Sequence, residues 1–195
     1  MPTPSTPSPP LRYDRVARAL HWLIGLALLA QIAFGFLLDE IAPRGTPARG
    51  AVINLHKSIG LVLALAIVLR LAWRLRHRPP PWPAAMPAWQ QRAAAWGHRG
   101  LYLCMLAMPL SGYLASNFSK HGVRFFGLAL RPWGPDLPAV YGLFNGLHIA
   151  TAWLFLALIA GHVLAALKHA WIDRDGVFAR MGPPLSRNKA EEDPP

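Results

Sequence analysis

Cysteine is almost absent from the sequence, because Cys104 is the only one among 195 residues. No intramolecular disulfide can form, and the missing Cys-x-x-Cys-His motif excludes a covalently attached c-type haem. Charged residues are also scarce, at 15% of the chain, whereas a soluble domain carries about 25%. The opening MPTPSTPSPP lacks the basic and apolar segments of a signal peptide, and we expect residues 1–12 to form a disordered tail.

Two stretches contain no charged residue at all, residues 19–38 and residues 140–167. Each is long enough for the about 20 helical residues that cross the hydrocarbon core of a bilayer. A soluble domain of this size could not hide several such helices, because too little of a small domain is interior. The sequence therefore predicts an integral membrane protein.

Four hydrophobic segments predict an all-α fold, an integral membrane four-helix bundle. They cover residues 18–38, 51–74, 93–116 and 140–169. The third segment is the weakest, because Arg99 lies near its start and Pro109 lies within it. Proline is tolerated in a membrane helix when neighbouring groups satisfy the carbonyl that it frees.

Basic residues indicate the orientation of the four spans, which place both termini on the same side. With the ends of the spans included, three Lys or Arg residues belong to the N-terminal flank, six to the connection between the second and third spans, and five to the C-terminal flank. The opposite side has six. Because basic residues accumulate in the cytoplasm, we expect cytoplasmic N and C termini. The net charge of +11 follows from this topology and does not indicate nucleic-acid binding.

Two loops have distinctive compositions. The proline-rich segment 76–92 should lie along the inner membrane surface, with Trp82, Trp89 and Trp96 near the interface. The outer segment 117–139 contains RFFGLALRPW, which fits either a short interfacial helix or a loop with a few buried aromatics.

Four of the eight histidines lie within the spans or at their ends, where an ionisable residue indicates a functional site. His21 and His162 should share a level near the cytoplasmic side, and His56 and His148 a level near the periplasmic side. His148 and His162 are 14 residues apart, close to four whole turns, so both point from one face at levels about 21 Å apart. For any single histidine the alternative is an interhelical hydrogen bond, but the four together predict two stacked sites.

Paired imidazoles from different helices suit the two axial positions of a haem iron. No Asp or Glu lies within an apolar run, whereas zinc and di-iron sites usually need carboxylate or thiolate ligands. The sequence thus predicts two non-covalent b-type haems, each pair of histidines ligating one iron, and no separate catalytic residue. Gly25, Gly60 and Gly161 adjoin these histidines, and they would either admit a porphyrin or pack helices.

Further residues are candidates for the same sites. Arg70 stands 14 residues after His56, where it would pair with a haem propionate or extend to the inner interface. His98 would donate to a quinone or a propionate, or be an ordinary interfacial histidine. We assign Arg70 and His98 to the cofactor-binding set. His169 is the rival of His162 as a ligand, but it lies at the membrane edge.

Five local motifs, in their order along the chain, resemble the bacterial cytochrome b561 family, which shares its fold with the cytochrome b subunits of nickel–iron hydrogenases. The motifs are RALHW, INLHKSIG, WGHRGLY, GLHIA and AGHVLAALKHAW, and DRDGVFARM follows them. The resemblance implies four membrane helices, two b haems held by the histidine pairs above, and electron exchange with a membrane quinone. We expect one domain over residues 13–181 in the bacterial inner (plasma) membrane, followed by a disordered tail over residues 182–195.

Some members of that family resemble superoxide oxidases, which pass electrons from superoxide to ubiquinone. The outer side has six basic residues against three acidic ones, which would attract such an anion, although solvation of an outer loop explains the same charge. The first hypothesis is a respiratory electron carrier or superoxide:quinone oxidoreductase, working in the lipid bilayer between quinone and a donor that is superoxide or a redox protein. The second is a cytochrome b subunit that anchors a dehydrogenase or hydrogenase. The third is a small membrane transporter whose histidines only pack.

Overall fold

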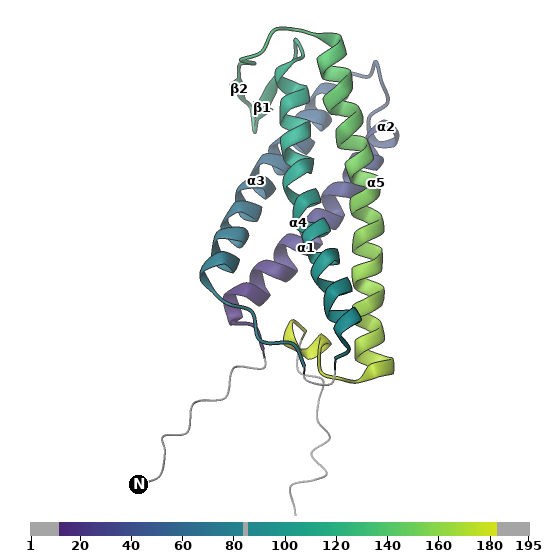
Figure 1. The fold of residues 1–195 in the computed structure, drawn as a ribbon. Helices are drawn as coiled ribbons and strands as arrows, with labels where there is room; N and C mark the ends of the chain where they lie inside the picture. Colours follow the sequence, from purple (N-terminus) through teal and green to yellow (C-terminus); the bar gives the residue numbers. More distant parts are fainter. Residues whose placement is uncertain (1–11, 84–85, 183–195) are drawn as a thin grey trace, which may run out of the picture.

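The computed structural model describes residues 12–83 and 86–182 (Figure 1), and long helices dominate it. The elements in chain order are α1 (Arg15–Phe36), α2 (Leu38–Ile41), α3 (Arg49–Arg76), α4 (Ala88–Asn117), β1 (Val123–Phe125), β2 (Leu128–Leu130) and α5 (Pro138–Lys168). A π-helical turn (His169–Asp173) and a 3-10 turn (Phe178–Arg180) follow α5. The predicted tails lie outside the described residues, except for Arg12 and Gly182.

Three helices are long and apolar enough to cross a membrane, namely α1, α3 and α5 together with its π-helical turn. The fourth long helix, α4, is not among them, and its residues 90–99 include two glutamines and two arginines. All four long helices overlap the segments that the sequence predicts. Each extends slightly beyond its predicted start.

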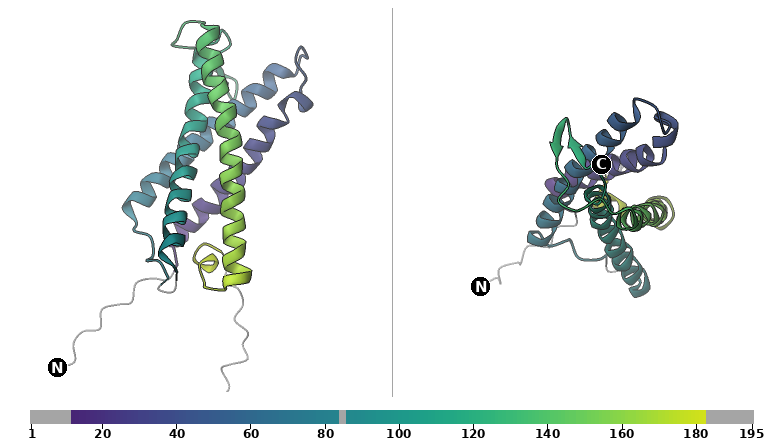
Figure 2. Two further views of the ribbon diagram at one scale, coloured as in Figure 1. Left: turned by 45° about the vertical axis from the view of Figure 1, so that its right-hand side comes forward. Right: turned by 90° about the horizontal axis from the view of Figure 1, so that it is seen from above.

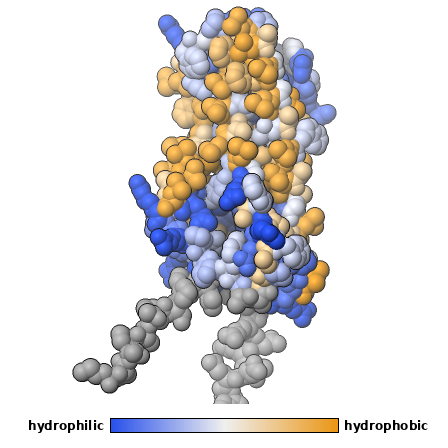
Figure 3. Space-filling model, in the orientation of Figure 1, coloured by the Kyte–Doolittle hydropathy of each residue, from blue (hydrophilic) through white to orange (hydrophobic). Residues whose placement is uncertain are grey.

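The outward surface of these helices is apolar. Leucines on all four long helices are more than half exposed: Leu23, Leu65, Leu103, Leu143 and Leu164. Figure 3 shows hydrophobic residues over the middle and upper part of one face, with hydrophilic residues gathered toward the lower end. A soluble protein rarely exposes an apolar surface of this extent, and in a bilayer the same leucines face lipid.

The helices pack as two antiparallel hairpins. α1 packs mainly on α3, and α4 packs along α5; contacts between α3 and α4 join the two hairpins. Figure 2 shows α4 and α5 running side by side while α1 and α3 lean together at another angle. A buried cluster draws on all four helices and comprises Ile24, Leu28, Ile32, Leu63, Ile67, Cys104, Met105 and Phe155. This apolar layer lies at mid-height and separates two histidine clusters.

One end of the bundle, which we call the terminal end, holds both ends of the described chain. Arg12 donates to the carbonyls of Ala179 and Gly182, and Arg180 donates to two carbonyls of the proline-rich loop, those of Pro80 and Pro81. The C-terminal segment thus crosses beneath the helices and ties the first helix to the loop between α3 and α4.

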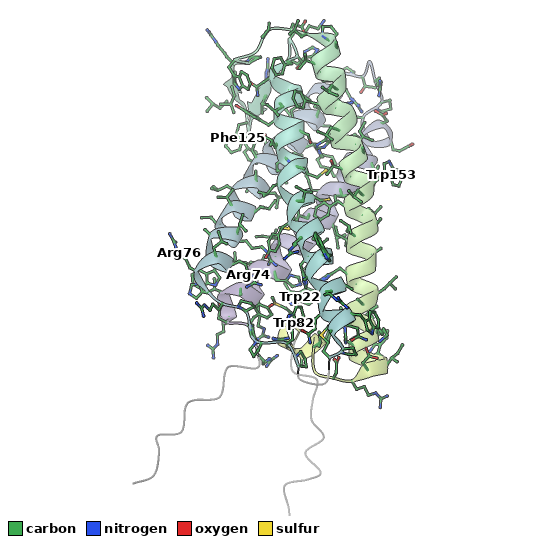
Figure 4. The ribbon with its side chains drawn as sticks, viewed as in Figure 1. Trp22, Arg74, Arg76, Trp82, Phe125 and Trp153 are labelled. Atoms are coloured by element: carbon green, nitrogen blue, oxygen red, sulfur yellow. The ribbon has the colours of Figure 1, made fainter. Side chains whose placement is uncertain are left out.

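Tryptophans and arginines surround the terminal end. Trp22 and Trp82 lie there with Arg74 and Arg76 (Figure 4), and Trp89 and Trp96 are more than 60% exposed. Such aromatic side chains are typical of a membrane interface. The last five residues of the predicted surface loop, 88–92, are in fact the start of α4, which begins at Ala88.

The opposite end, which we call the distal end, is covered by a β-hairpin. Val123 pairs with Leu130, and the two-residue turn has positive φ at Phe126 (45°) and Gly127 (97°), the geometry of a type I′ turn. The alternative of an interfacial helix in this segment is therefore wrong. Long-range contacts with α3 hold this hairpin: Asn54 Oδ1 accepts from the Arg124 N–H at 2.9 Å, and Ser58 Oγ accepts from the Phe126 N–H at 3.0 Å.

Candidate functional site

The distal histidine pair joins the two helical hairpins. His56 of α3 and His148 of α5 face each other with ring centroids 6.3 Å apart and ring planes at 87°. Both side chains are only partly buried, and they line a large cleft. The pairing that the sequence predicts from depth alone is therefore present as a contact between rings.

The ring of His148 is held by one face of α4. Its Nδ1 lies 2.9 Å from the carbonyl oxygen of Met108 and 3.3 Å from Ser111 Oγ. Because a carbonyl oxygen only accepts, Nδ1 carries the hydrogen and Nε2 keeps its lone pair. Gly112 leaves room for the ring, since a Cβ at that position would lie 3.1 Å from two of its atoms.

The ring of His56 lies against one face of α1, which presents a donor to its Nδ1, whereas the Met108 carbonyl presents an acceptor to Nδ1 of His148. Gln31 Nε2 donates to the His56 carbonyl at 2.7 Å and lies 3.1 Å from its Nδ1. Phe34 meets the ring edge-on, with centroids 5.6 Å apart. Gly35 again provides the space, because a Cβ there would lie 3.1 Å from Cε1 of His56.

The terminal-end cluster contains three imidazoles and one guanidinium. The His162 ring lies 6.0 Å from the His21 ring and 5.5 Å from the His98 ring. Arg70 Nη2 lies 3.3 Å from His21 Nδ1, and the guanidinium lies 6.0 Å from the centre of the Tyr102 ring. Arg70 Nε is buried and has no hydrogen-bond partner among the described residues. All four predicted residues of this end therefore meet.

His169, the rival of His162, takes part in a different cluster. Its Nδ1 lies 2.7 Å from an oxygen of Asp175 and 3.3 Å from an oxygen of Asp173. Lys168 also donates to Asp173. These contacts close the turn after α5, and they direct the His169 ring toward that turn.

A cleft of about 1770 Å³ opens on the distal pair. This volume exceeds the about 300–1,000 Å³ of an ordinary small-molecule pocket. Five cationic residues line it, Arg44, Arg49, Lys57, Lys120 and Arg124, together with the carboxylates Asp39 and Asp136. Lys57 Nζ donates to the Gly122 carbonyl at 2.8 Å, so one cation of this rim holds the β-hairpin in place.

Two glycines that the sequence analysis does not name lie against the histidine rings. Gly25 and Gly161 have no atom within 4 Å of an added Cβ, and Gly60 lies against Gln31. The glycines against histidine rings are Gly35 and Gly112. A signal for both exists in the sequence, because each follows a histidine of its own helix (His21 or His98) by fourteen positions, the interval that also separates the two histidines of α5.

Comparisons with known proteins agree with this architecture. Residues 12–184 match the family described as prokaryotic cytochrome b561. Cytochrome b561 homolog 2 of Escherichia coli (strain K12) is 34% identical over 174 residues, covering 88% of this chain and 92% of that protein. Cytochrome b561 homolog 1 of the same strain is 29% identical over 172 residues, covering 88% and 97%.

A third relative carries a functional name. The probable superoxide oxidase CybB of Yersinia pestis is 26% identical over 173 residues, covering 88% of this chain and 96% of that protein. The match to the family extends over all four long helices and both histidine clusters. The chain therefore belongs to the prokaryotic cytochrome b561 family, whose members are helical bacterial membrane proteins that bind b-type haem and take part in electron transport.

Proposed function

We propose that this chain is a dihaem b-type cytochrome of the bacterial inner membrane. It transfers electrons between a donor on the periplasmic side, for which superoxide is our candidate, and the membrane quinone. His56 with His148 holds the distal haem, and His21 with His162 holds the haem at the terminal end. The domain spans residues 13–181, with four membrane helices and both termini in the cytoplasm.

The spacing of the imidazoles is the observation that carries the proposal. Two metal–nitrogen bonds of about 2 Å each, with about 1 Å from each nitrogen to its ring centre, separate two axial rings by roughly 6 Å. The measured separations are 6.0 Å and 6.3 Å. A direct hydrogen bond between the rings would bring them closer, and this spacing leaves room for an atom between them.

The surroundings of His148 fit a haem ligand, whereas Gln31 and Arg70 present donors to Nδ1 of His56 and His21, and these donors would have to turn away before the two rings ligate through Nε2. The contact of His148 Nδ1 with the Met108 carbonyl leaves Nε2 free to ligate. At the terminal end the unpaired Nε of Arg70 suits a haem propionate, and His98 is placed to donate to a propionate or to a quinone. Bound haem would supply one-electron transfer, while these side chains fix its position.

The packing of α4 supports a fourth span. This helix lies along α5, and its outward residues Leu103 and Leu110 are 68% and 58% exposed, as on the three apolar helices. A fourth span also agrees with the meeting of the first and last described residues at one end. The basic residues of that end favour the cytoplasm.

The cationic residues that line the distal cleft support an anionic electron donor. Two superoxide anions would each lose one electron and leave as dioxygen, and one quinone would take up two electrons and two protons to become a quinol. The name of the Yersinia pestis relative is consistent with this donor. Attraction between the rim and an anion acts mainly on the rate of encounter and weakens as salt rises.

The first experiment is an optical spectrum of the purified protein, oxidised and dithionite-reduced, with haem quantified per chain. We expect two low-spin b haems, and one haem fewer in each of the variants His56→Ala and His21→Ala. A matched control is His77→Ala, because His77 stacks on Trp73 at 3.9 Å and lies outside both clusters. A colourless protein from haem-replete cells would refute the proposal and leave the transporter hypothesis.

Salt dependence tests the donor. We expect superoxide-driven quinone reduction to slow as ionic strength rises, and Lys120→Gln or Arg124→Gln to lower the rate at low salt. Arg131→Gln is the matched control, since Arg131 belongs to the same loop but does not line the cleft. A rate indifferent to salt and to these charges would exclude steering of superoxide. A stoichiometric partner that copurifies with the protein would instead favour the anchoring subunit.

A further inference from the structure

We propose that the β-hairpin formed by β1 and β2 docks on the lipid bilayer, with its apolar face against the leaflet at the distal end. Lipid is the one occupant that this inference assigns to that face. The inference goes beyond electron transfer, and it rests on the proposal that α3 crosses the membrane but not on haem ligation.

The hairpin is an amphipathic ribbon. Phe125 pairs with Leu128, and Arg124 pairs with Ala129. Directly opposed residues share a face of the ribbon, and side chains alternate between the two faces along a strand. Phe125, Leu128 and Leu130 therefore lie on one face, which is apolar, while Arg124 and Ala129 lie on the other.

The apolar face is covered by protein at its base and open along its outer strand. Val123 at the start of β1 is buried, whereas Leu128 is 66% and Leu130 37% exposed. Neither leucine lines the distal cleft, and Phe125 lies at the edge of the molecule in Figure 4. Exposed apolar surface beside polar residues marks a docking site for a protein or a membrane. The position of the hairpin on α3 decides between them.

A polar stripe on α3 holds the hairpin against that helix. Asn54, Lys57 and Ser58 are spaced i, i+3 and i+4, so they share one face of α3. Each bonds to a backbone group within residues 122–126, at distances of 2.8–3.0 Å. Polar side chains that face hydrocarbon without partners are costly. The hairpin satisfies these three with its backbone and presents apolar side chains in their place.

Ser58 gives the level of the hairpin along the span. It stands nine residues after Arg49, the first residue of α3, which is about 14 Å along the helix axis. Residues 58–69 contain no charge, so the hydrocarbon part of α3 begins at Ser58. Because Ser58 Oγ accepts from the N–H of Phe126 in the turn, the turn lies at the boundary between headgroups and hydrocarbon.

The residues around the hairpin match that level. On α3, Leu55 and Val62 are nearly half exposed above and below Ser58, so the apolar face of the hairpin continues the lipid-facing surface of the helix. Trp133 follows the hairpin and is 62% exposed, as is typical of an interfacial tryptophan. Arg124 and Arg131 are exposed, and they would meet headgroup phosphates at this depth.

The test places a nitroxide spin label on Leu128→Cys in the full-length, haem-loaded protein, within vesicles of phosphatidylethanolamine and phosphatidylglycerol. Oxygen concentrates in lipid and a nickel chelate stays in water, so their effects on the saturation of the label report its surroundings. We expect strong relaxation by oxygen and weak relaxation by nickel. Ala129→Cys is the matched control, since it lies next in the same strand on the opposite face, and it should show several-fold more relaxation by nickel than Leu128→Cys.

Two positions on α3 calibrate the measurement. Leu65→Cys, at a residue 62% exposed within the uncharged run, gives the value for lipid, and Ala48→Cys, just before α3, gives the value for water. Cys104 is 2% exposed, and the unsubstituted protein measures any label that it takes up. Leu130→Cys probes the same face of the hairpin when Leu128→Cys does not accumulate.

Labels on Leu128→Cys or Leu130→Cys that respond to nickel as Ala48→Cys does would overturn the docking. Labels shielded from both reagents, with spin–spin broadening, would show that a second copy covers the face, and they would overturn it too. A water-like value at Leu65→Cys would instead refute the span of α3 itself. The readout does not depend on electron transfer, so failure of the proposed donor or quinone leaves it intact.

Discussion

Replacing Gly112 by alanine tests whether the close approach of α4 to His148 matters for the distal site. In an ordinary helix interior this change stabilises the fold by up to about 1 kcal/mol. At Gly112 the new Cβ would lie 3.1 Å from both Nδ1 and Cε1 of His148, so the ring must move by a few tenths of an ångström. That movement strains the 2.9 Å hydrogen bond from Nδ1 to the Met108 carbonyl.

Gly112→Ala has two effects, a gain in helix propensity and a strained hydrogen bond of His148. They act in opposite directions on the free energy of unfolding, but only the second acts on haem binding. Loss of the hydrogen bond costs about 1 kcal/mol net, which offsets the gain in helix propensity. Groups that orient a metal ligand, in contrast, typically change affinity about 10–100-fold. We therefore expect a thermal unfolding midpoint close to that of the wild type, together with faster loss of one haem.

The assay is transfer of haem to an excess of a haem-scavenging protein, followed optically, beside thermal unfolding followed by circular dichroism. Gly146→Ala is the matched control, because Gly146 lies in α5 and a Cβ there meets no atom within 4 Å. If Gly112→Ala releases haem no faster than Gly146→Ala, the close approach of the two helices has no role in holding the ligand.

Three further outcomes follow from the packing and the termini. Phe155→Ala, at a core position 2% exposed, should destabilise the purified protein by about 3–5 kcal/mol in thermal unfolding, and an unchanged midpoint would contradict this. Arg180→Ala removes two 2.6 Å hydrogen bonds to the carbonyls of residues 80–81, and it should cost about 1.5–3 kcal/mol and speed proteolysis of the C-terminal segment. Asp14 caps the N-terminus of α1. Partial desolvation raises the pKa of its carboxyl group, but hydrogen bonds from the first-turn N–H and from Trp73 together keep this pKa below 3.8. The cap should thus contribute about 0.5–1 kcal/mol to the stability of the protein in full above pH ~4. This contribution should disappear as the pH falls through the lower folded-state pKa, and the variant Asp14→Ala should not show this loss of stability.

The long helices could be predicted from the sequence because their signal is local. Two uncharged runs are long enough to span a bilayer by themselves, and charge marks their ends. The start of α4 was harder to place, because residues 88–92 include two glutamines and an arginine and directly follow a proline-rich segment. The β-hairpin could not be predicted, since its strands have three residues each and depend on contacts with Asn54, Lys57 and Ser58 of a distant helix.

The histidine pairs could be predicted for a similar reason. An interval of 14 residues fixes both the level and the face of His148 and His162 on one helix, and depth alone then matches each with a partner. The groups that contact the histidine rings could not be predicted from the sequence. A backbone carbonyl such as that of Met108 carries no residue-specific signal, and the contact of Arg70 with His21 depends on how α3 packs against α1.

The arrangement as two hairpins has a consequence for biogenesis. Each histidine pair takes one member from the α1–α3 hairpin and the other from α5 of the second hairpin, so under the proposed ligation neither haem can be fully ligated until both hairpins are in the membrane. Under the proposed four-span topology each hairpin would insert by its own hydrophobicity, and haem binding would join the two hairpins in a later step. We expect cells starved of haem to hold inserted but loosely joined chains, which quality-control proteases would remove. Abundance of the protein would then follow haem supply without any change in transcription.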